Sequence, residues 1–278
     1  MFRRLITIAG ALGLAVSPML ADFSYQEKST VTGGAVAGIM KVAGVFSKAA
    51  REPIETTVAV KGDRMANRSD RHASIIDLGA QTITQIDLKK KTYSVMTFEQ
   101  MKAMLEQMQQ RMKQNPNAGQ MSFKVSANKT SNRKTIDGMA ATELILKMEM
   151  QGTDQQTGEQ GGMAITTDLW VAPAASGYAE VRGFHRRLAE KLNWAPGGNM
   201  FMSNPQVSEG MAEVAKEMSK LDGMPVFETL SMGTDASAGS LLEMTVEMSG
   251  FSSSPVDPTL FEVPAGFKKV EPDTRRRQ

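Results

Sequence analysis

The distribution of apolar and polar residues along the chain predicts a protein built mainly from β-strands. Between residues 143 and 151 every second side chain is apolar (Leu144, Leu146, Met148 and Met150) and most of the others are polar. Residues 242–248 alternate in the same way, with Leu242, Met244, Val246 and Met248 as the apolar set. A period of two places such side chains on one face of a strand. Both segments therefore predict antiparallel strands with one buried face.

Other segments with a similar pattern bring the expected total to ten or eleven strands. They are residues 22–32, 55–61, 72–78, 82–88, 91–97, 121–129, 163–172 and 224–233. Short polar turns such as Lys61-Gly62-Asp63 and Asp137-Gly138 connect several of them, and Thr153–Gly162 is expected to be a longer hairpin loop. Strands that are joined by short turns usually pair with each other. The sequence therefore predicts a meander.

Three segments have the spacing of amphipathic helices that could lie against a sheet. The clearest covers residues 98–113, where Thr97 and Gln100 form a capping box at the start and Asn115-Pro116 ends the helix. The other two cover residues 178–194 and 208–220. Each has apolar side chains along one face, so we expect the helices to cover one face of the sheet.

Residues 35–46 differ from these helices because Lys41 is their only charged residue. If the segment is helical, apolar side chains point in every direction, which is typical of a helix that is buried on all sides. It is too short to span a bilayer. Two interpretations stay open: a plain core helix, or a plug or lid over an apolar cleft.

The first 21 residues have the order that is typical of a secretory signal. Arg3 and Arg4 precede an apolar run, Leu5–Val16, and Ser17-Pro18-Met19-Leu20-Ala21 follows. We expect cleavage after Ala21, and the alternative is an uncleaved anchor, because Met19 is larger than the residue usual at its position. The chain has no cysteine, whereas exported eukaryotic proteins usually contain disulfides. The sequence therefore predicts a periplasmic protein of a bacterium.

The composition narrows the range of functions. There are no cysteines and two histidines, which excludes thiol chemistry and Cys- or His-rich metal sites. The formal charge is +2, but five of the arginines lie in the signal or in the final residues 275–277, so the rest of the chain is slightly acidic. A general nucleic-acid binder usually has a strong basic excess. We expect no nucleic-acid partner, no metal and no cofactor.

Two groups of residues raise the question of a polar site. Asp77 and Asp87 each end a predicted strand, and they are either turn-forming residues or a catalytic carboxylate pair. His185 lies among Arg182, Arg186 and Arg187, which form either a solvated helix face or a cationic patch for an anionic headgroup or partner. No nucleophile elbow, phosphate loop or HExxH pattern is present. The protein is therefore not expected to be an enzyme.

The order of these parts resembles the superfamily of bacterial outer-membrane lipoprotein carriers (LolA/LolB-like proteins). It is more closely similar to a family of exported proteins of unknown function that is assigned to that superfamily. Five segments carry the closer resemblance: Lys61–Met65, Ile75–Leu78, Lys91–Phe98, Asp168–Pro173 and Leu260–Phe267. None of them is a catalytic signature.

The resemblance implies an α+β fold in which a mainly antiparallel sheet forms an incomplete β-barrel, with amphipathic helices over its concave face. We expect a single LolA-like domain at residues 22–271 and a disordered basic tail at 272–278. The 22 methionines are expected mainly to pack the core, and the alternative is a methionine-lined surface that adapts to irregular apolar ligands. The expected ligand-lining residues are Val36, Ile39, Met40, Phe46, Met101, Met104 and Met108.

The sequence thus predicts a periplasmic binding module that sequesters or carries an acyl chain or another hydrophobic ligand in a lidded half-barrel. A lipidated protein is a further candidate partner, as is peripheral contact with the envelope. The alternative is a structural or protein-interaction domain of the envelope whose own helices fill the groove permanently. The two hypotheses differ in whether a ligand can exchange.

Overall fold

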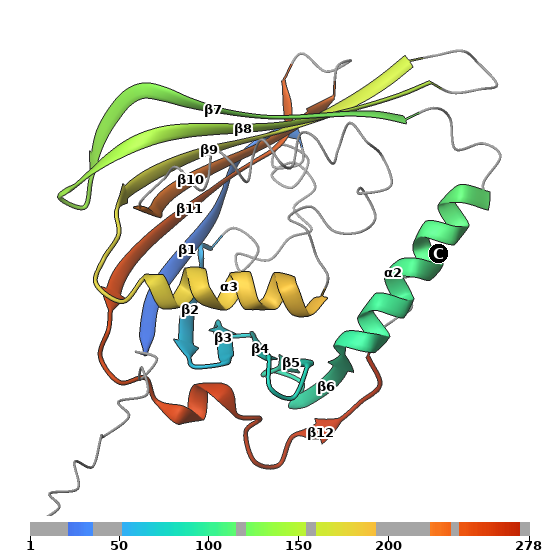
Figure 1. The fold of residues 1–278 in the computed structure, drawn as a ribbon, viewed down its shortest axis with the longest axis vertical. Coiled ribbons are helices and arrows are strands. Elements are labelled where there is room, and N and C mark those ends of the chain that lie inside the picture. The colour runs from blue at the N-terminus through green and yellow to red at the C-terminus, as the bar shows by residue number, and fades with distance from the viewer. Residues whose placement is uncertain are drawn as a thin grey trace, which may run out of the picture.

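A computed structural model describes residues 22–35, 52–114, 121–153, 160–192, 223–234 and 239–272. Within these ranges, twelve strands form one sheet and two α-helices accompany it (Figure 1). The helices are α2 (Phe98–Gln114) and α3 (Ala179–Leu192), and a short 3-10 helix, η2, covers Pro258–Phe261. The strands are β1 (Phe23–Gly33), β2 (Ile54–Lys61), β3 (Arg64–Arg68), β4 (His72–Asp77), β5 (Thr82–Asp87), β6 (Thr92–Thr97), β7 (Met121–Ile136), β8 (Met139–Thr153), β9 (Gln160–Pro173), β10 (Gly223–Thr234), β11 (Ser240–Ser252) and β12 (Lys268–Lys269).

The sheet consists of two meanders that are joined through β1. Its strand order is β12-β6-β5-β4-β3-β2-β1-β11-β10-β9-β8-β7. All neighbours are antiparallel except β12, which pairs with β6 in parallel. The prediction of one continuous meander was therefore wrong at β6 and β7, which α2 connects and which lie far apart in the sheet. In the described part of the chain the two edge strands, β7 and β12, do not pair, so the sheet is not closed.

The predicted strands are confirmed in position, but their number and lengths differ. Strand β3 was missed because its two buried residues, Met65 and Ala66, are adjacent and do not alternate with polar ones. Strand β7 continues to Ile136, beyond the predicted end at residue 129, because a bulge between Lys129 and Arg133 lets the pairing with β8 resume. The two-residue strand β12 and helix η2 were also missed, since neither has a periodic pattern of its own.

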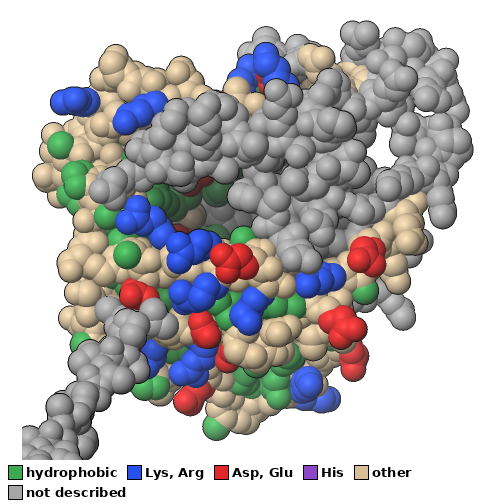
Figure 2. Space-filling model, in the orientation of Figure 1, with side chains coloured by type: hydrophobic (Ala, Val, Ile, Leu, Met, Phe, Trp, Pro, Cys, Tyr) green, Lys and Arg blue, Asp and Glu red, His purple; other side chains and the backbone are tan. Residues whose placement is uncertain are grey.

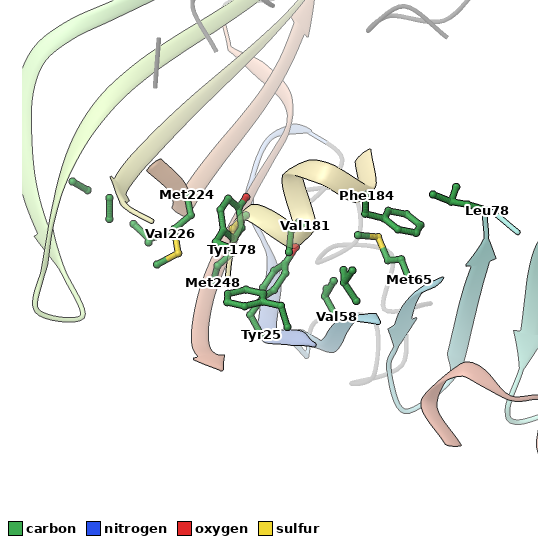
Figure 3. Close-up of a cluster of buried hydrophobic side chains, with 14 of the residues drawn as sticks. Tyr25, Val58, Met65, Leu78, Tyr178, Val181, Phe184, Met224, Val226 and Met248 are labelled. Carbon is green, nitrogen blue, oxygen red and sulfur yellow. The ribbon is translucent and has the colours of Figure 1, made fainter. Parts of the chain in front are cut away.

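The main hydrophobic core lies between the sheet and α3 (Figures 1 and 3). Phe23 of β1, Val60 of β2 and Phe184 of α3 are all fully buried in it. The Tyr178 ring, just before α3, meets Phe23 edge-on at 5.8 Å between centroids. From the second half of the helix, Arg187 donates hydrogen bonds to the Asp63 carboxylate (3.1 Å) and to the Gly62 carbonyl (3.0 Å). Apolar burial and this polar contact together fix α3 across the sheet.

A second core occupies the opposite face of β2–β5. Alternate residues of these strands point to the two faces, so Val58 and Val60 enter the main core while Ala59 enters the second. The last part of the chain covers this second face, where Val256 and Phe261 are buried. The expectation of one buried face is therefore wrong for this half of the sheet.

Helix α2 begins as the sequence predicts. The Thr97 amide donates to Gln100 Oε1 (2.9 Å), and the Gln100 amide donates to Thr97 Oγ1 (3.1 Å). These reciprocal bonds are the capping box. Phe98, the first helical residue, is buried in the main core, and Met101 packs against it. The predicted helix at residues 208–220 lies outside the described residues, as does the segment 35–46 apart from Ala35.

Helix α3 contributes to stability mainly through its buried aromatic side chain. Removing a buried Phe side chain loses its transfer free energy and leaves a cavity. We therefore expect Phe184→Ala to lower the free energy of unfolding by about 3–5 kcal/mol. Arg186→Ala, on the exposed side of the same helix, should change it by less than about 0.5 kcal/mol. Urea denaturation followed by circular dichroism measures both, and equal effects would contradict the packing described for α3.

Candidate functional site

The α3-facing side of β8–β11 carries a large apolar surface that extends beyond the main core. We call it the methionine patch, and it consists of Leu146, Met148, Met150, Met163, Ile165, Leu230, Met232, Leu242 and Met244. Strand pairing aligns these residues in rows across the sheet. In one row Met148 pairs with Ile165, Ile165 with Met232, and Met232 with Leu242. Paired residues of antiparallel strands point to the same face, so the row is continuous.

Burial decreases along this face with distance from α3. Leu144 and Leu169, which share the face, are 0% and 8% exposed, and Met248 is 7% exposed. All members of the methionine patch are only half-buried. Figure 2 shows the surface hollowed beside α3, with hydrophobic side chains visible inside the hollow. The patch is therefore an apolar surface that the described part of the chain does not bury completely.

Two carboxylates lie on the same face, at the border between the core and the methionine patch. Glu27 of β1 pairs with Met248, and Glu228 of β10 pairs with Val246. Met248 and Val246 are alternate residues of β11 and both contact the main core. Glu27 and Glu228 therefore flank β11 on the α3-facing side. We call them the interior carboxylate pair.

The surroundings of the interior carboxylate pair disfavour its negative charge. Burial raises the pKa of Glu27, and a hydrogen bond from the Tyr25 hydroxyl opposes this increase only in part. Burial also raises the pKa of Glu228, and the charge of Glu27 raises it further. Two like charges close together in a poorly solvated place cannot both ionise without a free-energy cost. The pair therefore holds a proton more readily than exposed glutamates do.

Two tyrosines interact with Glu27 of this pair: Tyr178, just before α3, and Tyr25 of β1. Burial raises the pKa of Tyr178 to about 12, with the Arg182 charge lowering it and the Glu27 charge raising it. Burial together with the Glu27 charge also raises the pKa of Tyr25. Both tyrosines therefore stay protonated over the physiological range, and the Tyr25 hydroxyl donates a hydrogen bond to Glu27.

The opposite face of the sheet holds a separate polar cluster. Glu143 is 7% exposed and accepts hydrogen bonds from the Thr130 hydroxyl (2.7 Å) and the Asn132 amide (2.8 Å). Burial and the neighbouring Glu143 raise the pKa of Asp168. Leu144 and Leu169, the next residues in each strand, point to the α3-facing side, which places Glu143 and Asp168 behind the methionine patch. This cluster ties the bulge of β7 to β8 and β9.

The expected ligand-lining residues are only partly described. Val36, Ile39, Met40 and Phe46 lie outside the described residues, and so does the side chain of Met108. On helix α2, Met101 packs against the main core, whereas Met104 is 38% exposed. The lining assigned to these residues therefore stays a prediction.

The sequence interpretation missed the interior carboxylate pair. The signal was present in β1, where Glu27 follows Phe23 and Tyr25 at the same spacing and so takes an inward position. Glu228 has the same relation to Val226. A charged residue at an inward-facing position of a strand indicates that folding moves a charged group away from water.

Of the two polar groups considered from the sequence, the aspartates have structural roles, whereas both interpretations of the basic group on α3 stay open. Asp77 accepts a hydrogen bond from the Ala80 amide (2.8 Å), and Asp87 accepts one from the Lys90 amide (2.8 Å). They close turns at opposite ends of the β4–β5 hairpin, so they do not form a catalytic pair. On α3, Arg182, His185 and Arg186 are exposed, and basic side chains line this helix in Figure 2.

No protein-family model matches the chain, and no curated protein matches it. Among the described residues, no group of three or more His, Cys, Asp or Glu side chains is arranged to hold a metal ion. The described helices include none that is both long and apolar enough to cross a membrane.

The interior carboxylate pair should make stability depend on pH in a defined direction. Because the pKa of Glu228 is raised in the folded state, its contribution to stability is fully present below the unfolded pKa and is lost as pH rises through the folded pKa. We therefore expect Glu228→Gln to raise the melting temperature at pH 7.5. The gain should vanish below pH of about 4, where the carboxyl is protonated in both states. Thermal denaturation at several pH values measures this, and a gain that is independent of pH would contradict the assignment.

Proposed function

We propose that this protein is a non-enzymatic binding module of the bacterial periplasm that holds an acyl chain or another hydrophobic ligand. The methionine patch is the observation that carries the proposal. It extends the core face of the sheet but is only half-buried, so part of its apolar area is left for contact with an apolar ligand. Methionine side chains are flexible and polarizable, so such a surface adapts to a chain of irregular shape.

The energetics of such a site require no directional contacts. Burial of an alkyl chain contributes about 0.8 kcal/mol for each methylene group. A chain of moderate length on the methionine patch therefore gains useful affinity from transfer out of water alone. An open, curved sheet with a helix across its face suits such a ligand, and it agrees with the incomplete barrel that the resemblance to LolA/LolB-like carriers implies.

The chemistry of the described residues favours binding over catalysis. The turn-forming roles of Asp77 and Asp87 leave them no part in a reaction. Glu143 and Asp168 are held within a polar cluster on the other face of the sheet. The signal-like residues 1–21 support export to the periplasm, where a carrier of hydrophobic ligands or of lipidated proteins has its use.

Two adjacent residues of β8 provide a matched test of the site. Leu146 belongs to the methionine patch, whereas Ile145 points to the opposite face, and both are half-buried. Leu146→Asn should weaken the binding of a pyrene-labelled monoacylglycerol at least about tenfold, since a polar amide replaces apolar contact area. Ile145→Asn should leave the affinity within about twofold of the wild type. Fluorescence titration gives both values, and thermal denaturation shows that each variant is folded.

Native mass spectrometry of gently purified protein distinguishes the proposal from its alternative. Co-purified lipid that exchanges for the added monoacylglycerol supports a carrier. Protein without lipid that also fails to bind the probe supports an envelope interaction domain whose groove is permanently filled. Equal loss of affinity in the Leu146 and Ile145 variants would contradict a site on the methionine patch.

A further inference from the structure

The methionine patch and the interior carboxylate pair lie on one continuous face. Glu228 is two residues from Leu230 in β10, and Val246, the partner of Glu228, is two residues from Met244 in β11. Leu230 and Met244 are themselves a cross-strand pair. An apolar chain that lies on the patch and reaches towards α3 therefore meets the carboxylates next.

Within the described ranges, few charged groups of opposite sign lie beside the interior carboxylate pair. On β1, Tyr25 donates a hydrogen bond to Glu27. From the turn before α3, Tyr178 interacts electrostatically with Glu27, and Arg182 of α3 interacts with Tyr178. The residues paired with Glu27 and Glu228 on β2, β9 and β11 are Thr56, Leu169, Met248 and Val246, none of which is charged. The nearest base in the same row of the sheet, Lys129, is on the edge strand β7, three strands away from Glu228.

We propose that hydrophobic ligands bind to this face together with protons taken up by Glu27 and Glu228, so that binding strengthens as pH falls. An acyl chain over the pair removes water from both carboxylates, and the loss of hydration penalises the charged form much more than the neutral form. Burial already raises the pKa of both residues in the ligand-free protein, and further burial under a ligand acts in the same direction. This inference rests on the proposed function and adds its regulation.

Linkage sets the size of the expected effect. Each proton that is taken up on binding changes the dissociation constant by up to about tenfold per pH unit. This holds in the pH range between the pKa of the carboxyl group in the free protein and its pKa in the complex. As pH falls, the affinity stops increasing once both carboxyl groups are already protonated in the ligand-free protein. The dissociation constant should therefore rise with pH and level off at acidic pH.

The experiment measures the affinity for the pyrene-labelled monoacylglycerol from pH 4.5 to 8. This probe has no titratable group, so any pH dependence belongs to the protein. The wild type should bind at least tenfold more tightly at pH 5 than at pH 8. The double variant Glu27→Gln/Glu228→Gln should bind with an affinity that is independent of pH and at least equal to that of the wild type at pH 5. Circular dichroism at each pH confirms that the proteins are folded.

Asp168 provides the matched control. Its pKa is also raised by burial and a neighbouring carboxylate, but it lies on the opposite face of the same sheet. Asp168→Asn should therefore keep the pH dependence of the wild type. Binding that is strong but independent of pH in the wild type would overturn the proton coupling while leaving the proposed function intact. An unchanged slope in the double variant, or a slope abolished by Asp168→Asn, would overturn it equally. Absence of saturable binding at every pH would overturn the proposed function and the coupling together.

Discussion

The pairing of β1 with β11 is the interaction on which the rest of the structure depends. Each meander on its own is held by short connections, but β1 and β11 are more than 200 residues apart in sequence, and their ladder alone joins the two meanders edge to edge. It runs from Ser24 opposite Ser252 to Gly33 opposite Glu243, with irregularities near both ends. The joined sheet presents a single face, which α3 crosses. Without this ladder the main core would lack one of its walls.

The two halves of the sheet bury their residues differently because they are covered differently. Strands β2–β5 lie between the main core and the C-terminal segment, so adjacent residues such as Val60 and Ala59 are fully buried on opposite faces. The Asp22 carboxylate helps to fix that segment, since it accepts hydrogen bonds from Lys61 (2.7 Å) and from the Val256 amide (2.8 Å). Strands β8–β11 have a buried portion near α3 and the half-buried methionine patch beyond it. One half of the sheet is thus covered on both faces, and the other keeps an apolar surface that is only half-buried.

The interior carboxylate pair lies where these two environments meet. A glutamate in the full core would be excluded by its desolvation cost, and one on an open surface would keep its ordinary pKa. Half-buried beside β11, Glu27 and Glu228 have an intermediate position in which burial raises the pKa of both carboxyl groups. This shift connects the electrostatics of this face with the proposed binding of an apolar ligand.

The sequence by itself determined the elements whose cause is local. Alternation revealed β8 and β11, the capping box fixed the start of α2 at Phe98, and the apolar spacing around Phe184 located α3 within two residues at each end. Asp77 and Asp87 could be interpreted as turn residues because their hydrogen bonds reach only two or three residues along the chain.

Only the tertiary structure decided which apolar faces come together and where polar groups become buried. Strand β3 and the second core depend on a C-terminal segment that has no periodicity, and the adjacency of Glu27 and Glu228 depends on the β1–β11 register. The reason is physical: a strand's pattern states which side chains share a face, but the partner strand and the cover of that face come from distant parts of the chain. The burial of Glu27 and Glu228, and therefore the rise in their pKa, depends on this tertiary arrangement.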